Sequence, residues 1–180
     1  MPRQHSDSQE FSRFVEADSI GTHRLERRIS ANPEERAALA KRFDLIGIDR
    51  LEASFSLKRA GGGVIHVEGA VEAEVTQACV ITLAPVPAKV AETFSADFAD
   101  EDRRKEPDPD LAFDAEDPPE PIRNGHIDLG ELAAEQLALA LDPYPKAPGA
   151  AIPAEFSPDP DAETVPEPPI NPFSILKNPK

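Results

Sequence analysis

The chain has 180 residues, 34 of them acidic and 19 basic, so its formal net charge is −15. This charge argues against a DNA-binding or bulk nucleic-acid-binding protein, which needs a net basic face, and it favours a basic partner. The sequence has no run near the ~18 apolar residues of a membrane span and no signal peptide, and its single cysteine excludes an internal disulfide or a cysteine-based zinc site. We therefore expect a cytoplasmic protein that makes no membrane contact.

Two elements are expected near the start of the chain. The segment Phe11–Val15 predicts a short strand. Further along, Asn32 can accept the backbone N–H of Glu35, Glu35 can bond back to Asn32, and Pro33 fits the first helical position. Apolar residues then recur at helical spacing, so a helix is predicted over about 33–44.

A β-hairpin is predicted next. From Leu51 onward the apolar residues occupy odd positions and the polar residues even positions, which is the period of a half-buried strand. Gly61–Gly63 can turn the chain, because glycine tolerates positive φ. The same odd register then runs from Ile65 to Leu83, which predicts a second strand that is either long or bent near Gly69 or Thr76.

Two prolines and a third strand follow the hairpin. Pro85 and Pro87 are expected to end the second strand, because proline cannot donate to a strand ladder. Residues 90–98 alternate again, with Val90 and Phe98 on the same side, and this predicts a further strand.

Acid and proline are concentrated in the second half of the chain. Residues 97–120 hold 11 acidic and 3 basic side chains, and 16 of the 20 prolines lie at or after Pro107. Segments rich in proline and acid and poor in apolar residues have the composition of disorder. We therefore expect an acidic, flexible loop over about 100–121 and a proline-rich, flexible tail over 147–180.

A second helix is the clearest element in the sequence. Asp128 can cap it, Glu131 follows three residues later, and Pro143 stops it, so the helix is predicted over about 128–142. The sum is an α+β fold, an antiparallel β-sheet with two main helices, in a single domain over 8–146. The pattern leaves open whether the sheet curves or closes into a barrel.

A search for reactive groups predicts no catalytic, cofactor or metal site. The four histidines are scattered and form no ligand pair at helical spacing, and no phosphate-binding loop or nucleophile–base pattern is present. Cys79 falls on the apolar register, which indicates a buried structural cysteine with nothing nearby to lower its pKa. We expect a protein that is not an enzyme.

Two surface features are candidate contact sites. Arg24, Arg27 and Arg28 belong to the stretch 21–42, which carries six bases and three acids, and they are candidates for contact with RNA phosphate. The alternative is an ordinary solvated surface. The only tyrosine, Tyr144, lies between two prolines, and we expect this segment to stop the helix and fold back onto the core.

The end of the chain is a third candidate. Asn171, Pro172 and Phe173 open the peptide NPFSIL, a small apolar cluster after a proline-rich tether. Such a cluster is typical of a docking peptide. The alternative is that it docks on its own domain.

Two internal segments and the terminal peptide resemble the YceD family. The first segment is QACVITLAPV, beginning at Gln77, and the second runs from Ile127 to Pro145. The residues that carry the resemblance are Gln77, Cys79, Thr82, Leu83, Asp128, Leu129, Gln136, Leu137, Asp142, Pro143, Tyr144 and Pro145. Many members have a Cys-x-x-Cys form of the first segment. Here Thr82 stands in place of the second cysteine, so any metal role suggested for those members is not carried to this chain.

The resemblance implies a function in ribosome biogenesis. The family is described as large ribosomal RNA subunit accumulation proteins of bacteria and plastids, needed for normal levels of 23S rRNA and not known to be enzymes. Joined with the acidic charge, the resemblance leads to the hypothesis that the chain holds a basic large-subunit ribosomal protein, or a pre-ribosomal particle, through the acidic loop over 97–120. The rival mechanism is direct 23S rRNA contact through Arg24, Arg27 and Arg28. Two alternatives from other classes are an RNA-processing or RNA-modifying enzyme and a scaffold that recruits a partner through its C-terminal peptide.

Overall fold

The computed structural model describes residues 10–100 and 118–152. The chain divides into one unit over 1–148 and a second over 149–180, and the helices and strands of the described residues belong to the first. A sheet of five strands has the order β2-β3-β4-β5-β6. Its strands are β2 (Leu25–Ser30), β3 (Gly47–Arg59), β4 (Ile65–Ala78), β5 (Pro85–Asp100) and β6 (Glu120–Ile122). Neighbours pair antiparallel, except that β5 and β6 are parallel.

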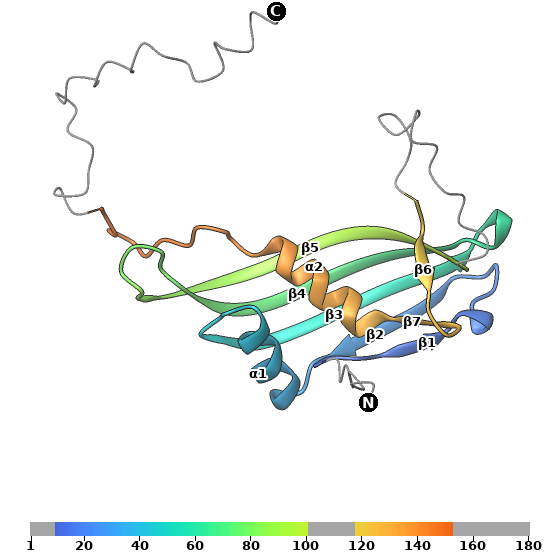
Figure 1. The fold of residues 1–180 in the computed structure, drawn as a ribbon, viewed down its shortest axis with the longest axis horizontal. Helices are drawn as coiled ribbons and strands as arrows, with labels where there is room; N and C mark the ends of the chain where they lie inside the picture. The colour runs from blue at the N-terminus through green and yellow to red at the C-terminus, as the bar shows by residue number, and fades with distance from the viewer. Residues whose placement is uncertain (1–9, 101–117, 153–180) are drawn as a thin grey trace, which may run out of the picture. The chain divides into compact units, whose positions relative to one another are not determined.

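Two helices and a small second sheet pack against one face of this sheet (Figure 1). The elements are α1 (Pro33–Arg42), α2 (Leu129–Ala140) and the antiparallel pair β1 (Phe14–Glu16) and β7 (His126–Asp128), with 3₁₀ turns at Ala17–Ser19 and Gly61–Gly63. Helix α2 contacts β4 and β5, and α1 contacts β3. Among the described residues β2 and β6 form the edges and the sheet stays open, so the α+β class is confirmed without a barrel.

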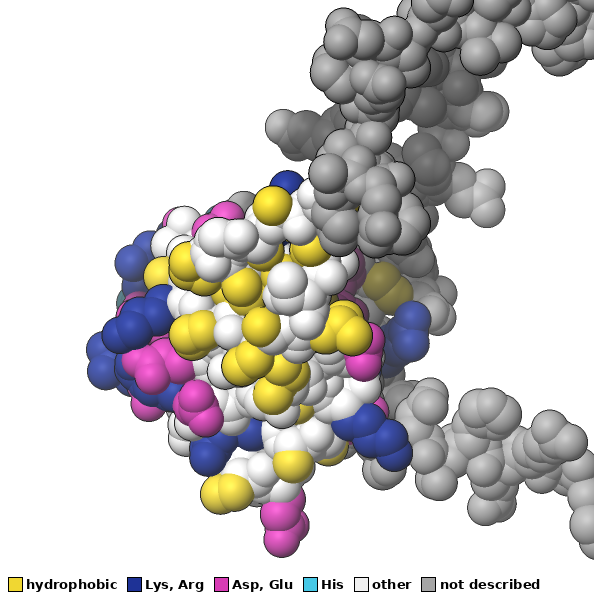
Figure 2. Space-filling view, turned by 90° about the vertical axis from the view of Figure 1, so that its left-hand side faces the viewer, with side chains coloured by type: hydrophobic (Ala, Val, Ile, Leu, Met, Phe, Trp, Pro, Cys, Tyr) yellow, Lys and Arg dark blue, Asp and Glu magenta, His cyan; other side chains and the backbone are white. Residues whose placement is uncertain are grey.

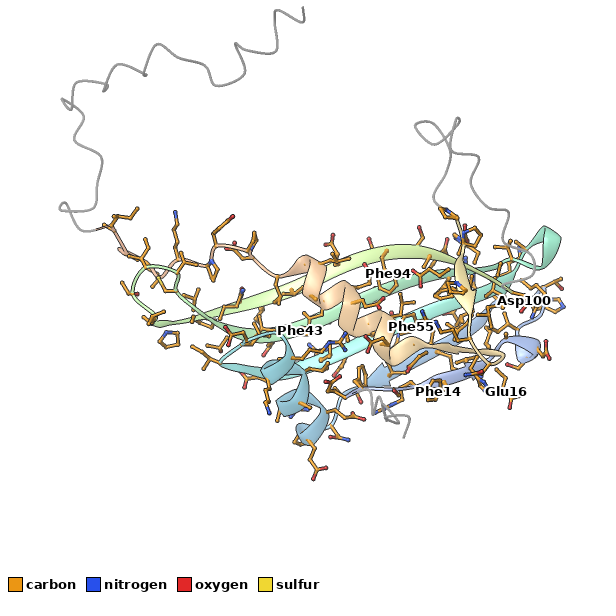
Figure 3. All side chains as sticks on the ribbon, in the orientation of Figure 1. Phe14, Glu16, Phe43, Phe55, Phe94 and Asp100 are labelled. Carbon is orange, nitrogen blue, oxygen red and sulfur yellow. The ribbon has the colours of Figure 1, made fainter. Side chains whose placement is uncertain are left out.

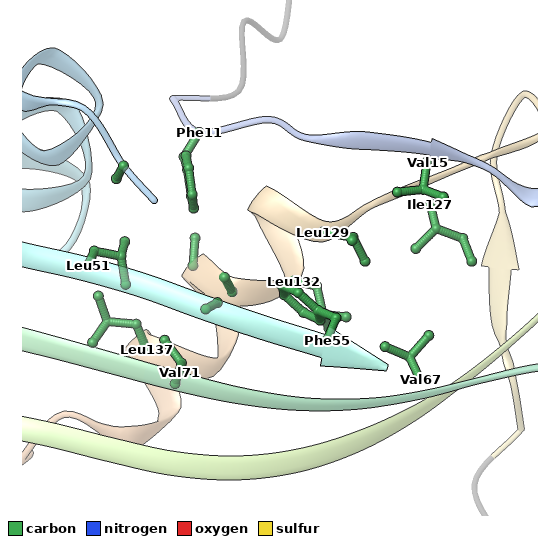
Figure 4. Packing of buried hydrophobic residues seen from close by; sticks show 14 of the residues in the cluster. Phe11, Val15, Leu51, Phe55, Val67, Val71, Ile127, Leu129, Leu132 and Leu137 are labelled. Atoms are coloured by element: carbon green, nitrogen blue, oxygen red, sulfur yellow. The ribbon is translucent and has the colours of Figure 1, made fainter. Parts of the chain in front are cut away.

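The hydrophobic core lies between the covered face of the sheet and α2 (Figure 4). Alternation along each strand places one set of side chains on this face and the other set on the opposite face. The buried residues include Phe11, Val15, Leu51, Phe55, Val67, Val71, Ile127, Leu129, Leu132 and Leu137. Burial of such side chains stabilises a fold by roughly 1.5–3 kcal/mol each, so apolar contact holds α2 on the sheet.

Helix α1 begins with the predicted capping box. The side chain of Asn32 accepts the backbone N–H groups of Glu34 and Glu35, both at 2.9 Å, and Glu35 Oε2 accepts the Asn32 N–H at 2.8 Å. Glu35 also pairs with Arg13, whose guanidinium lies 2.8 Å away and keeps the pKa of Glu35 below its usual range. The same carboxylate therefore caps α1 and ties it to the start of the chain.

A glycine in the middle of β4 lets two aromatic rings meet. Gly69 pairs with Phe55 on β3 and with Phe94 on β5. A Cβ added at Gly69 would lie 2.3 Å from the Phe94 ring, so a larger residue would displace that ring. The rings of Phe55 and Phe94 meet edge to face with centroids 5.9 Å apart (Figure 3). A pair of this kind contributes about 0.5–1.5 kcal/mol beyond burial.

The predicted end of the second hairpin strand is wrong. Strand β4 stops at Ala78, and the odd register that continues to Leu83 belongs to a turn. Pro85 and Pro87 do not end a strand but begin β5, which also contains the predicted strand over 90–98. They are tolerated because β6 pairs only with the last residues of β5, so in the described residues the outer side of the first half of β5 has no neighbour.

Asp128 caps helix α2 as predicted, but the side chain of Glu131, three residues later, does not complete a capping box with it. Asp128 Oδ1 accepts the N–H groups of Gly130 at 2.9 Å and Arg13 at 2.7 Å. Glu131 pairs with Arg42 at 2.6 Å, which links α2 to α1. Three charged side chains, Asp128, Glu131 and Arg42, therefore fix the N-terminal end of α2. The helix ends at Ala140.

Parts of the prediction fall on residues outside the description. The acidic loop predicted over about 100–121 overlaps the end of β5 and the start of β6, and its residues 101–117 lie outside the described ranges. The tail from 153 to 180, with Asn171, Pro172 and Phe173, also lies outside them. None of the described helices has the length and apolar character to cross a membrane.

Candidate functional site

Two segments separated by about sixty residues meet at one end of the sheet. At the end of β4, Gln77 Nε2 donates to the carbonyl oxygen of Asp142 at 2.8 Å. Just after the strand, the Val80 N–H donates to the carbonyl oxygen of Pro145 at 2.9 Å. We call residues 79–84 the loop, residues 141–147 the strap, and the two together the loop–strap site. Eight of the residues predicted from the family resemblance lie in this site or next to it: Gln77, Cys79, Thr82, Leu83, Asp142, Pro143, Tyr144 and Pro145.

The loop is closed by main-chain hydrogen bonds across its base. The Cys79 N–H donates to the Ala84 carbonyl at 2.8 Å, and the Leu83 N–H donates to the Cys79 carbonyl at 2.9 Å. Leu83 has φ 59°. This left-handed conformation costs a residue with a Cβ roughly 1–2 kcal/mol. The loop therefore holds an apolar residue in a strained backbone conformation.

The cysteine sulfur lies inside the loop and accepts several hydrogen bonds. Cys79 is fully buried, as predicted, and its Sγ accepts the N–H groups of Ile81 and Thr82, each at 3.4 Å. Hydrogen bonds from the backbone of Ala147 and the side chain of Thr82 lower the pKa of the thiol to about 6. The expectation that nothing nearby would lower this pKa is wrong. Uncharged hydrogen-bond donors of the loop and the strap lower it, without any charged side chain.

The strap follows directly from α2. The Tyr144 N–H donates to Asp142 Oδ1 at 2.9 Å, which is a local turn, and Pro145 is buried under the loop contact. The side chain of Tyr144 is 72% exposed. The predicted packing of Tyr144 onto the core is therefore wrong: the main chain of the strap is docked, and the ring points to solvent.

Exposed apolar side chains gather over this end of the molecule (Figure 2). In the loop, Leu83 is 76% exposed and Val80 is 49% exposed, and Tyr144 of the strap is exposed as well. Ile46, in the turn before β3, is 56% exposed and its N–H donates to the Thr76 carbonyl beside the same end of β4. Exposed apolar groups that are clustered on an ordered frame mark interaction surfaces.

The remaining residues of the family resemblance support the frame. Asp128 caps α2, and Leu129 and Leu137 are buried in the core beneath it. Gln136 is half-buried on the same helix. These residues fix the helix from which the strap extends, while the loop and the strap carry the exposed contacts.

The three predicted RNA-contact arginines do not form one patch. Arg24 pairs with Glu68 at 3.0 Å on the face of the sheet away from the helices. Arg27 and Arg28 are neighbours on β2 and therefore point to opposite faces. Arg28 shares its face with Glu52, whose pKa is lowered mainly by Arg50 and also by Arg28. The arginines are thus mixed with carboxylates over the surface.

In the described residues no group of three or more His, Cys, Asp or Glu side chains is arranged to hold a metal ion. Thr82, in place of a second cysteine, contributes its hydroxyl to the Cys79 sulfur. The chemistry that the loop–strap site offers is therefore apolar and aromatic contact, with one buried thiol.

Comparison with protein families gives one match. The family model described as large ribosomal RNA subunit accumulation protein YceD matches residues 67–180, which is more than half of the chain. Neither the curated proteins nor the solved structures give a match. The matched span contains both the loop and the strap.

Proposed function

Because the chain belongs to the YceD family of large ribosomal RNA subunit accumulation proteins, we propose that it is a non-enzymatic factor that supports accumulation of 23S rRNA in the cytoplasm by binding a basic large-subunit ribosomal protein. Membership in the family supports a role in ribosome biogenesis in general. The finer proposal concerns how the chain acts: it binds a partner through the loop–strap site.

A single observation carries this proposal. Leu83 is a large apolar side chain, 76% exposed, in a backbone conformation that disfavours any residue with a Cβ. Such strain persists only where surrounding structure enforces it, and it concentrates at functional sites. Here the loop bonds to Cys79 and the strap bond to Pro145 enforce it. Burial of the Leu83 side chain by a partner would explain why an exposed leucine occupies this strained position.

The chemistry of the surface favours a protein over RNA as the partner. Val80, Leu83 and Tyr144 offer apolar and aromatic area of the kind found at the centre of protein interfaces. The net charge of −15 repels phosphate and attracts a basic protein, and electrostatic steering of this kind speeds encounter. Direct contact with rRNA through Arg24, Arg27 and Arg28 is less favoured, because Arg24 pairs with Glu68 and Arg28 lies near Glu52.

The experiment is affinity purification of the tagged full chain from growing cells, with protein and RNA both identified. We expect large-subunit proteins or precursor particles with the unmodified chain, and their loss with Leu83→Ser. The matched control is Leu139→Ser, because Leu139 is 79% exposed on α2 and belongs to neither the loop nor the strap. Equal recovery by the two variants would overturn the proposed site.

A second pair of variants separates protein from RNA as the primary partner. Replacing Arg24, Arg27 and Arg28 by glutamine should leave recovery of ribosomal protein unchanged if the partner is a protein held at the loop–strap site. Loss of recovery with this triple variant, together with unchanged recovery for Leu83→Ser, would instead identify direct rRNA contact as the mechanism.

A further inference from the structure

The outer side of strand β5 carries a row of backbone groups that point away from the sheet. The Cys79 N–H donates to the Ala84 carbonyl, and this pair continues the register of β4 and β5. Residues that bond to the neighbouring strand alternate with residues whose N–H and C=O groups point away from it. The even-numbered residues of β5 therefore bond to β4, and the odd-numbered ones point outward. After Lys89 the outward positions are Ala91, Thr93 and Ser95.

In the part of the chain that the structure describes, no strand lies beside these three positions. Strand β6 is on this side of β5, but it pairs only with Phe98, Ala99 and Asp100. A strand beside residues 91–95 would therefore lie in line with β6 and extend a pairing that already exists. Edge strands that avoid pairing usually carry charges or proline at the edge. The three outward residues are exposed and uncharged, so the edge is suited to pairing here.

An exposed leucine of α2 faces the same side of the sheet. Glu135 of α2 lines a hollow together with Glu120 and Pro121 of β6, so this side of the helix faces β6. Leu139 follows Glu135 by four residues and lies on the same side of α2. The helix contacts β5 and runs from the β6 end of the sheet toward the loop (Figure 1). Leu139 is therefore placed over the part of β5 that β6 leaves open, and its side chain is exposed.

The charge around this open edge is negative. Glu92 is exposed between the outward positions, and Glu120 and Glu135 lie toward β6. Lys89 is already paired with Glu74, at 3.3 Å. The chain's own residues 101–117 hold eight acidic and three basic side chains, so these charges repel them. Charge complementarity therefore favours a basic segment from another protein as the occupant.

We propose that an extended, basic segment of a protein partner adds to the sheet as a strand beside Ala91, Thr93 and Ser95. Strand addition takes affinity from main-chain hydrogen bonds and specificity from alternate side chains. A segment in which apolar and basic residues alternate fits this edge, because an apolar side chain on the covered side would bury Leu139. The inference rests on the proposed function only for the identity of the protein that supplies the segment.

Amide hydrogen exchange of the free, full chain tests first whether the edge is open. We expect fast exchange at Ala91, Thr93 and Ser95, and slow exchange at Val90 and Phe94, which bond to β4. Protection of the three outward amides in the free chain would show that another part of the chain, or a second copy, already covers the edge. That result would overturn the proposal.

A designed peptide then tests the pairing itself. The probe is acetyl-KVKVKVK-amide, titrated into the full chain labelled for NMR. We expect saturable shifts and slowed exchange at the amides of Ala91, Thr93 and Ser95. One control peptide has the same sequence with methylated backbone nitrogens, which keeps the charge and prevents pairing, and another has glutamate in place of lysine. Absence of protection with the probe, or equal protection with either control, would contradict strand addition.

Variants locate the pairing within the molecule. Thr93→Pro removes one outward N–H and should weaken binding of the probe about two- to tenfold, the effect of one lost hydrogen bond. Ser30→Pro is the matched control on the opposite edge: the Ala31 N–H donates to Leu51 on β3, so position 30 of β2 points outward. Equal weakening by both variants would contradict the site. If Thr93→Pro does not fold, the methylated peptide still decides.

The same variants distinguish this inference from the proposed function. Leu83→Ser leaves the edge of β5 intact, so this variant should still bind the probe peptide. In the affinity purification, Thr93→Pro should reduce recovery of ribosomal protein. Unchanged recovery with Thr93→Pro, together with loss for Leu83→Ser, would overturn strand addition and leave the loop–strap proposal standing.

Discussion

The side chains at the two ends of α2 are held in place in different ways. At the strap end, Leu83 and Tyr144 project from a main chain fixed by backbone hydrogen bonds, and their side chains touch solvent. At the N-terminal end, Asp128 caps the helix and Glu131 pairs with Arg42, so the acidic side chains there hold the fold together. The exposed side chains at the strap end can therefore change without loss of stability, whereas a change at the N-terminal end of α2 also disturbs the fold.

The largest expected effect comes from the close approach of two backbone segments at the N-terminal end of α2. A Cβ added at Gly130 would lie 2.4 Å from the carbonyl oxygen of Phe11, so the backbone must shift. Gly130→Ala should therefore reduce the free energy of unfolding, measured in urea, by about 2 kcal/mol. Gly47→Ala is the control, because nothing lies within 4 Å of its added Cβ, and it should stay within about 0.5 kcal/mol. If Gly130→Ala left the free energy of unfolding unchanged, the contrast between the two ends of α2 would be contradicted.

A smaller effect is expected where the strap is attached. Gln77→Leu removes the hydrogen bond to the Asp142 carbonyl and should cost about 1 kcal/mol. Hydrogen exchange of the Val80 N–H, which donates to Pro145, should accelerate while exchange in α2 stays unchanged. Gln136→Leu, on a half-buried position of α2, is the control. Faster exchange throughout α2 would show that strap and helix unfold together.

The third expected effect is a pH dependence at the loop. The pKa of Cys79 is about 6 in the fold and about 8.5 in an unfolded chain. Because the folded pKa is the lower one, the thiolate contributes stability that is fully present above pH about 8.5 and is lost as the pH falls through about 6. The difference in unfolding free energy between the unmodified chain and Cys79→Ala should follow this course.

The ultraviolet absorbance of the thiolate gives the same pKa directly. Its midpoint should lie near pH 6, and Thr82→Val should move it upward, because the hydroxyl of Thr82 is one of the groups that lower the pKa. A midpoint near the ordinary value in the unmodified chain would show that the strap backbone at Ala147 does not reach the sulfur.

The smallest effect on stability is expected at the tip of the loop. Leu83→Gly relieves the positive φ but adds flexibility to the unfolded chain, so stability should rise by less than about 1 kcal/mol. Leu139→Gly, at an equally exposed leucine in α2, should lower stability by about 1 kcal/mol. Opposite signs for two exposed leucines would confirm the strain, and a loss of stability at both would contradict it.

Much of the fold was predictable because local rules governed it. The capping residues Asn32 and Asp128 and the alternation after Leu51 depend on nearest neighbours in the chain, and the structure confirms α1, α2 and the first hairpin strand. The short strands β6 and β7 were not predicted, because three residues are too few to distinguish an alternating pattern from chance. Pairing with distant partners forms them.

The sequence predicted some residues of the loop–strap site but not its geometry. The family resemblance marked Cys79 and Tyr144, but periodicity placed Cys79 and Leu83 in a strand, since a turn can preserve an odd register by chance. The meeting of the loop and the strap depends on a hydrogen bond between Val80 and Pro145, and no spacing rule encodes that contact. The prolines at 85 and 87 were the available signal that the chain had turned before them.

Those two prolines have a consequence for association between copies of the chain. In the described residues the first half of β5 is an unpaired edge, and it lies directly after the exposed loop. An open edge beside an apolar surface normally invites a foreign strand and leads to aggregation. Pro85 and Pro87 remove the N–H donors at alternate positions of this edge, and Lys89 adds a charge two residues further on. The protein can thus keep apolar side chains exposed beside this edge while the prolines oppose growth of the sheet into a fibril.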